Sequence, residues 1–243
     1  MSHYIALTCS ALARSVYAAA AVADPAISVR LLDQGLHNAP KNLRARLQAA
    51  IDAVQPGECD AILLVYGICG ASTIGLTARR TQLVLPRAHD CITLYLGSKE
   101  RYQAEFDAHP GTYWYSQDYL ERNPSSSAIA LGAASIEVSE ALYQSYVQKY
   151  GQDNADYLME VMGEWGQHYE RAVFIDTGSS AAFEQLAREQ AERRGWAFER
   201  KTGDRRLVNK LLNGEWTDDE FLVVPPGCQV ALSADSGLIE ARP

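Results

Sequence analysis

The chain has 243 residues, 47% of them hydrophobic, so it is long enough to bury a sizeable core in one large α/β domain or two smaller ones. Its formal net charge is -8 and its basic residues are scattered, which argues against a nucleic-acid or anionic-membrane surface and favours small molecules or other proteins as partners. Without a signal-peptide pattern or an apolar run long enough to cross a membrane, the sequence predicts a cytoplasmic protein.

Short apolar runs alternate with helical patterns in the first part of the chain. The strand-like runs are 4–8, 27–32, 61–66 and 83–85, and the helical segments between them include 11–23 and 43–54. The run 61–66 is apolar throughout, as expected for a parallel strand that is covered on both faces. This alternation predicts an α/β fold of the Rossmann-like, three-layer kind, with a mostly parallel sheet and right-handed crossovers.

The rest of the chain divides into further segments. We expect a helix from Ile92 through Phe106, a strand at 112–116, a loop at 123–127 and two helices broken at Gly151. A second α/β block then has strands near 172–176, 196–199 and 221–224. The predicted blocks are 1–122, a helical connection at 123–170, and 171–243. The sequence leaves open whether the outer blocks are two lobes or two halves of one sheet.

Polar residues follow each of the first four predicted strands. They are Cys9; Asp33, Gly35, His37 and Asn38; Gly67, Cys69 and Gly70; and Arg87, His89, Asp90 and Cys91. In open parallel sheets, ligands bind beyond the carboxyl ends of the strands. Because those ends meet at one edge of the sheet, we expect the four loops to line a single cleft.

Three of these loops carry a cysteine. Cys9 and Cys91 start predicted helices, where the positive end of the helix dipole favours a thiolate. Three converging thiolates repel one another unless a positive group holds them, so Cys9, Cys69 and Cys91 are predicted to bind zinc or an iron–sulfur cluster near His89. The spacing contains no CxxC pair, and reactive thiols or simple core packing remain the alternatives. Cys59 and Cys228 are expected to be structural.

The other residues of the cleft each have two interpretations. Asp90 is either the N-cap of the helix that starts at Cys91 or a catalytic partner of His89. Arg87 either holds a carboxylate or phosphate of the substrate or pairs with Asp33. Gly67 and Gly70 either let the backbone approach a cofactor or form an ordinary tight turn.

Three further residues are candidate substrate contacts. His37 and Asn38 precede a predicted helix near Pro40, for which Asn38 is also a candidate N-cap. Asp176 begins the loop DTGSS of the second block, which has the character of an anion-binding strand-to-helix turn. In that loop Ser179 is expected to be a helix cap rather than a nucleophile, because no GxSxG elbow surrounds it.

Several longer strings resemble a known family. They are LLDQGLHNAPKNLRARLQAAID, CDAILLVYGICG, PRAHDCITLYLGSKERY, HPGTYW, VFIDTG and DDEFLVVPPG. They resemble the bacterial and archaeal family with domain of unknown function 1638 (DUF1638), and PRAHDCITL is the most specific of them. The resemblance implies a family pattern with cysteines at positions 9, 69 and 91 and histidines at 37 and 89. It also implies an association with anaerobic one-carbon and corrinoid methyl-transfer gene sets.

Together these features predict a metal-centre enzyme, a transferase or lyase, that acts on a small molecule and holds zinc or a [4Fe–4S] cluster. The resemblance makes one-carbon or methyl-transfer metabolism its expected setting, with a corrinoid protein or methyltransferase as the expected partner. The competing interpretation is a non-catalytic carrier of a metal, corrinoid or one-carbon compound. The absence of a recognisable nucleophile–base pair favours the carrier.

Overall fold

The computed structural model describes residues 1–122, 144, 147–148, 151–154, 169–234 and 237–243. They form two compact units, one of Met1–Gln103 with Gly203–Pro243 and one of Ala104–Thr202. The first contains a five-stranded, mostly parallel sheet and the second a separate three-stranded parallel sheet. The predicted α/β class and the mostly parallel sheet are therefore confirmed.

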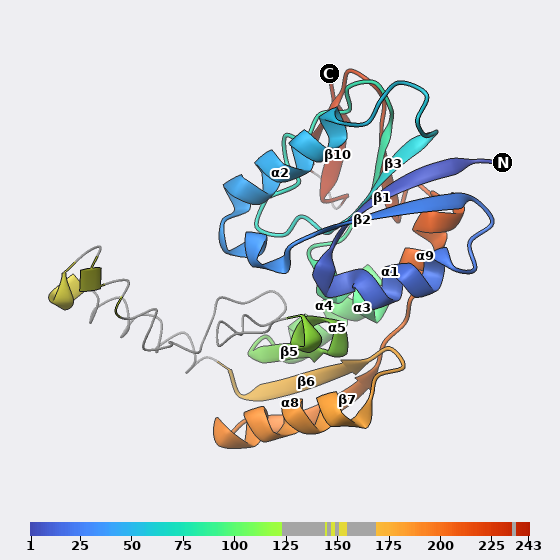
Figure 1. Cartoon of the computed structure of the whole chain (residues 1–243). Coiled ribbons are helices and arrows are strands. Elements are labelled where there is room, and N and C mark those ends of the chain that lie inside the picture. Colours follow the sequence, from blue (N-terminus) through green and yellow to red (C-terminus); the bar gives the residue numbers. More distant parts are fainter. Residues whose placement is uncertain (123–143, 145–146, 149–150, 155–168, 235–236) are drawn as a thin grey trace. The chain divides into compact units, whose positions relative to one another are not determined.

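The five-stranded sheet has the order β2-β1-β3-β4-β8 (Figure 1). Its strands are β1 (His3–Cys9), β2 (Ala26–Leu32), β3 (Ala61–Val65), β4 (Leu83–Pro86) and β8 (Phe221–Val224). The first four are parallel and β8 runs antiparallel to β4. Every residue of β3 and β4 is buried, which explains why these segments are apolar without alternation.

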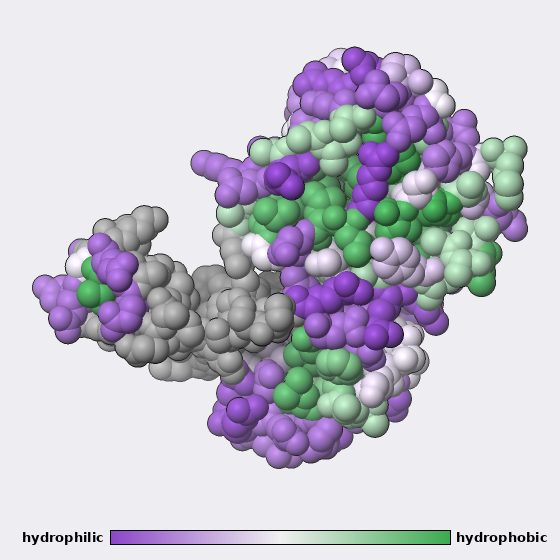
Figure 2. All heavy atoms as spheres, in the orientation of Figure 1, coloured by the Kyte–Doolittle hydropathy of each residue, from purple (hydrophilic) through white to green (hydrophobic). Residues whose placement is uncertain are grey.

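Helices cover both faces of this sheet. Figure 1 shows α2 (Pro40–Asp52) on one side of the strands, and α1 (Ala13–Ala20) with α9 (Arg206–Asn213) on the other. Since the crossovers from β1 to β2 and from β2 to β3 run in opposite directions, a right-handed connection places α1 and α2 on opposite faces. α2 buries Leu43, Leu47 and Ile51, which share one face of the helix. Figure 2 shows that hydrophobic residues also lie at the surface below α2, while hydrophilic residues cover the upper rim of this unit.

The strand order creates a switch point in the sheet. From β1 the chain continues to β2 on one side and then crosses to β3 and β4 on the other. At such a point the loops after the two central strands leave in opposite directions and open a crevice between them. In this chain these are the loops after β1 and β3, which carry Cys9 and Cys69.

The helical pattern after β4 is interrupted in the structure. The single helix predicted from Ile92 through Phe106 is wrong, because the structure has α3 (Cys91–Leu96) and α4 (Lys99–Ala108). Gly97 ends α3 with a φ of +76°, and a Cβ at this position would lie 2.7 Å from the Cβ of Asp204. α4 buries none of its residues, so the segment after Gly97 has no apolar pattern that marks it as a separate helix.

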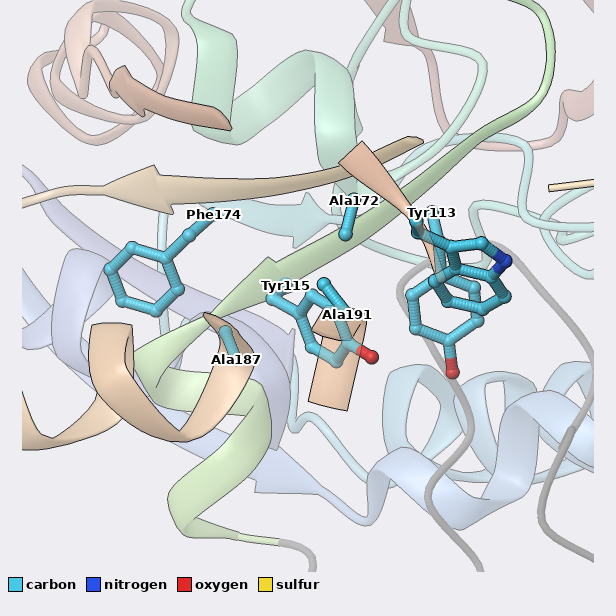
Figure 3. Close-up of a cluster of buried hydrophobic side chains, with 7 residues drawn as sticks. Tyr113, Tyr115, Ala172, Phe174, Ala187 and Ala191 are labelled. Atoms are coloured by element: carbon cyan, nitrogen blue, oxygen red, sulfur yellow. The ribbon is translucent and has the colours of Figure 1, made fainter. Parts of the chain in front are cut away.

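The second unit is built on the sheet β5-β6-β7. Its strands are β5 (Thr112–Ser116), β6 (Arg171–Asp176) and β7 (Ala197–Thr202), and its helices include α5 (Gln117–Glu121) and α8 (Ala181–Arg193). Figure 3 shows part of its core, which comprises Tyr113, Tyr115, Ala172, Phe174, Ala187, Ala191 and Trp196. The two small residues of α8 in this cluster let the helix pack closely on the aromatic rings.

The structure divides the predicted block 171–243 between the two sheets. β6 and β7 pair with β5, whereas β8 pairs with β4, and a hairpin of β9 (Gln229–Leu232) and β10 (Ile239–Arg242) follows. The loop expected at 123–127 and most of the two helices expected before 171 lie outside the described residues. Within the part of the chain that is described, no helix has the length and apolar character that a membrane crossing requires.

Candidate functional site

The loops that follow β1, β2 and β3 are joined by side chains. Ser10, after β1, accepts a hydrogen bond of 3.0 Å from the backbone N–H of Gln34 in the loop after β2. From that second loop, the ring of His37 stacks on the ring of Tyr66 directly after β3, with centroids 6.1 Å apart and an interplanar angle of 22°. The loops of the central strands therefore meet at the carboxyl edge of the sheet, as the sequence predicts.

The loop after β4 joins the same edge through backbone hydrogen bonds. The N–H groups of Ile68 and Cys69 donate to the carbonyls of Ala88 and His89 over 2.9 and 3.1 Å. Gly67 makes this approach possible, because a Cβ there would lie 2.6 Å from the Cα of Asp90. Gly67 is thus required for packing, and the cofactor contact predicted for it stays a prediction.

The loop after β3 has an uncommon conformation. Cys69, Gly70 and Ala71 have φ values of +46°, +64° and +63° in succession. Positive φ is unfavourable for residues with a side chain, so the surrounding contacts must hold Cys69 and Ala71 in place. One such contact is the guanidinium of Arg44 on α2, which donates to the carbonyl of Ala71 over 2.7 Å.

The three predicted metal ligands come together around Tyr66. Cys9 ends β1, and its Sγ accepts from the N–H of Ala11 at 3.4 Å. Cys69 lies in the loop after β3, and Cys91 is the first residue of α3. Thr8 pairs with Val65 on neighbouring strands, so Cys9 and Tyr66, which follow them, lie at the ends of adjacent strands. Burial raises the pKa of the Tyr66 hydroxyl, and ionisation of any of the three sulfurs would raise it further. The three cysteines therefore form a group near Tyr66.

The surroundings of Cys69 and Cys91 favour the neutral thiol over the thiolate. Burial raises the pKa of Cys69 and of Cys91, and the nearby charges of Asp90 and Cys9 raise both values further. The N–H of Cys91 at the start of α3 opposes this effect and is outweighed. The start of α3 thus favours a thiolate at Cys91, as predicted, but desolvation of the charged sulfur exceeds this effect and raises the pKa overall. A metal that binds here must displace protons.

The donors of a metal ion must converge on one point. Among the described residues, no three His, Cys, Asp or Glu side chains converge closely enough to hold a metal ion. Each Zn–S bond is only about 2.3 Å long, so a zinc ion would require the cysteine side chains to move closer together.

Asp90 connects the cysteine group to a histidine. Its Oδ1 accepts from the N–H of Ile92 at 2.9 Å, which confirms the predicted N-cap of α3. Its Oδ2 lies 3.2 Å from Nδ1 of His89 and accepts from the hydroxyl of Tyr102 at 3.1 Å. The rings of His89 and Tyr102 also stack, with centroids 5.8 Å apart. One buried carboxylate thus caps a helix and orients an imidazole.

His89 has the environment of an acid–base group. The hydrogen bond to Asp90 raises the pKa of its imidazole against the opposing effect of burial. Its side chain is 65% exposed, so a ligand at this edge of the sheet can reach it. Tyr102, which completes the arrangement, was missed in the sequence because it lies on α4 with no pattern that links it to His89.

Tyr66 and His37 each bury a polar atom that has no partner among the described residues. Tyr66 is 1% exposed, and its hydroxyl has no hydrogen-bond partner among the described residues. Nε2 of His37 is likewise buried and unpaired within that part of the chain, and burial lowers the pKa of this imidazole. A buried polar group without a partner costs about 1–3 kcal/mol. Tyr66 follows an apolar strand, so the sequence pattern indicates only another core residue.

The remaining residues predicted at this edge have different places. Asn38 is the last residue of the 3₁₀ helix η2 (Gln34–Asn38), and the N-cap of α2 is Ala39, so the capping role predicted for Asn38 is wrong. Arg87 donates to the backbone carbonyls of Asp218, Gly237 and Ile239. It therefore ties down the C-terminal segment, while Asp33 caps η2 through the N–H of Gly35.

Asp176 lies in the second unit, at the end of β6. Its Oδ1 accepts from the N–H groups of Gly178 and Ser179 at 2.9 and 2.6 Å, and its Oδ2 pairs with Arg200. The carboxylate thus occupies the N–H groups that an external anion would use. The cap of α8 is Ser180 rather than Ser179.

The comparison with known families identifies the chain at the level of family. A family model described as "Protein of unknown function (DUF1638)" matches residues 31–212, which is more than half of the chain. The chain belongs to this family. The DUF1638 match includes Tyr66, Cys69 and Cys91 and begins after Cys9. No curated protein and no solved structure matches the chain.

Proposed function

We propose that this DUF1638 protein is an enzyme that acts on a small molecule at an iron–sulfur centre held by Cys9, Cys69 and Cys91. The observation that carries the proposal is the position of these cysteines, because Cys9 ends β1, Cys69 follows β3 and Cys91 follows β4, at the carboxyl ends of neighbouring parallel strands. Ligand sites of parallel sheets form at this edge. A [4Fe–4S] cluster that is fully ligated by protein binds four cysteines. Three cysteines would therefore leave one iron open.

The residues of the chain have distinct roles in this proposal. When bound, a three-cysteine cluster supplies an open iron that polarises an oxygen or nitrogen of the substrate. The buried strands β3 and β4 lie behind the site, and Cys9 and Cys91 are themselves shielded from water. His89, oriented by Asp90, gives or takes a proton at its exposed edge.

The pairing of His89 with Asp90 favours an enzyme over a non-catalytic carrier. A carrier of a metal, corrinoid or one-carbon compound needs only the ligands of its cargo. An exposed histidine whose other nitrogen faces a carboxylate is the usual arrangement of a general acid or base. A one-carbon compound, with a corrinoid protein or methyltransferase as partner, is the first combination to test, because the family resemblance implies that setting.

Anaerobic purification followed by iron, zinc and sulfide analysis tests the metal centre. The proposal expects about four irons and four sulfides per chain, with the broad brown absorption of a cluster. A colourless protein with one zinc per chain would show that the centre is a zinc site and not a cluster. Protein with no stoichiometric metal, whether prepared with or without oxygen, would overturn the proposal.

The variant His89→Asn separates an enzyme from a carrier. Asparagine keeps a polar group of similar reach and cannot exchange a proton near neutral pH. We expect full iron content in this variant and a loss of turnover of at least about 100-fold, the usual contribution of a general acid or base. Turnover at the wild-type rate would exclude His89 as the catalytic group.

A further inference from the structure

Tyr66 is placed where a phenylalanine would serve the fold equally well. Its ring is buried at the end of β3, with 1% of the residue exposed. Its hydroxyl finds no acceptor or donor among the residues that the structure describes. Burial raises the pKa of this hydroxyl well above its usual value, so it remains an O–H group that can donate. A buried donor without a partner destabilises the protein by itself, unless a ligand accepts from it.

His37 provides a second unpaired group at the same place. Its ring stacks on the ring of Tyr66, although it comes from the loop after a different strand. Its Nε2 is buried and has no partner in the described part of the chain. Because burial lowers the pKa of His37, the imidazole is neutral at pH 7 and carries one N–H that can donate. Two stacked rings therefore present polar groups that the protein itself does not satisfy.

The charges around these groups restrict the ligand. The carboxylate of Asp90 acts on the imidazole of His37, and its charge is negative. It would repel an anionic ligand bound at His37. A neutral molecule with a carbonyl or hydroxyl oxygen can accept from Tyr66 and His37 without this penalty.

We propose that Tyr66 and His37 form the substrate subsite of this protein, and that they bind the oxygen of a small uncharged carbonyl or hydroxyl compound. The subsite lies where the cysteines lie, because Cys9 ends the strand next to that of Tyr66, and the loop after Tyr66 carries Cys69 and bonds to His89 near Cys91. The inference rests on the proposed function only where it names the bound compound as the substrate of a reaction. The hydrogen-bonding role of Tyr66 and His37 rests on their burial and lack of a partner, and it can be tested separately.

The first test compares two buried tyrosines of the same unit. Tyr95 is also 1% exposed, and its hydroxyl donates to the carbonyl of Ala11. We expect Tyr66→Phe to leave the melting temperature of the full-length protein unchanged or to raise it, because the variant loses an unpaired group. Tyr95→Phe should lower it by about 2–5 °C. If Tyr66→Phe lowers it as much as Tyr95→Phe, a structural partner such as a buried water satisfies the hydroxyl, and the inference is wrong.

The second test measures binding with two isosteric probes. Acetamide is neutral and has a carbonyl oxygen, whereas acetate has the same shape and a negative charge. In an NMR titration of the anaerobically purified protein, we expect acetamide to bind in the millimolar range and acetate to bind at least about tenfold more weakly. Tyr66→Phe and His37→Phe should each weaken acetamide by about threefold to tenfold. Equal binding of the two probes, or acetamide binding unchanged in both variants, would overturn the subsite.

Iron and sulfide analysis of the same preparations keeps the two proposals apart. We expect Tyr66→Phe to retain the iron of the wild type, because the substitution removes no sulfur donor. A wild-type protein without metal that still shows the tyrosine and acetamide effects would remove the proposed centre and leave the subsite. A protein with full metal and none of these effects would remove the subsite alone.

Discussion

The two parallel sheets of this protein differ in how their polar groups are paired. In the three-stranded sheet, Lys201 binds Glu105 and Glu199 over 2.5 and 3.0 Å, and Arg171 pairs with the same two carboxylates. In the five-stranded sheet, Tyr66 and His37 are buried without a partner in the described part of the chain. The second unit also buries polar atoms without a partner in that part of the chain, such as the hydroxyl of Ser179, but only at the five-stranded sheet do two such groups belong to rings that stack on each other.

The difference gives a criterion for finding the site. Buried polar groups in folded proteins are nearly always hydrogen-bonded, since an unpaired one destabilises the fold. A network such as that of Arg171 and Lys201 therefore stabilises the structure. Unpaired groups beside clustered cysteines instead indicate a place that a ligand completes. If the contrast holds, substitutions at the two sheets must affect metal content and stability differently.

The largest effect is expected at the cysteines. Cys69→Ser or Cys91→Ser should reduce bound iron to less than about a tenth of the wild-type content, because the cluster loses one of three protein donors. Cys59→Ser and Cys228→Ser are matched controls, since both are partly buried cysteines outside the group around Tyr66, and they should keep the full content. Equal iron in all four variants would mean that the cysteine group is only part of the core.

Gly67→Ala should be the most damaging change to the scaffold of the site. The added Cβ would lie 2.6 Å from both the Cα and the N of Asp90, in backbone that cannot easily move. We expect the free energy of unfolding to fall by about 2–4 kcal/mol in urea denaturation. Gly57→Ala is the control, because Gly57 has a positive φ but no atom within 4 Å of the added Cβ. A loss at Gly67 no larger than the loss at Gly57 would contradict the close approach of the two loops.

Arg171→Met tests the paired region. The Arg171 side chain is only 11% exposed, and its loss leaves Glu105 with Lys201 as its remaining cation. We expect a destabilisation of about 1–3 kcal/mol by urea denaturation, with the iron content unchanged. Arg242→Met, which removes a more exposed pair with Glu240, should change stability by less than about 0.5 kcal/mol. Loss of iron in Arg171→Met with stability preserved would reverse the roles assigned to the two regions.

Asp176→Asn should have the smallest effect, and the effect should depend on pH. Burial tends to raise the pKa of Asp176, but the N–H groups of Ser179 and Gly178 and the charge of Arg200 outweigh it and lower the value. The ionised carboxylate therefore stabilises the fold above the ordinary pKa of 3.8, and this contribution is lost as the pH falls through the lowered pKa.

Urea midpoints measured at pH 7 and near the acid limit of folding check this prediction. The wild type should be more stable than Asp176→Asn at pH 7, and the two proteins should converge in acid. A difference that stays constant with pH would show that the charge of Asp176 contributes nothing to stability.

Particular residues show how far the sequence could predict the site. The apolar run 61–66 and the polar residues after it place Cys69 at a strand end, because burial patterns and turns are local properties of the chain. Tyr102 could not be assigned to His89, since only the packing of α4 brings their rings together. The raised pKa of Cys91 could not be predicted for a related reason. Its helix position is local, whereas its desolvation comes from the surrounding fold.

The sequence by itself determined the α/β class, the parallel strands with their polar ends, and membership of the DUF1638 family, because these follow from local pattern and composition. Only the tertiary structure decided that β8 pairs with β4, that β5, β6 and β7 form a separate sheet, and that Tyr66 and His37 are left unpaired. Strand pairing and hydrogen-bond partners depend on residues far apart in the chain, and no local pattern records them.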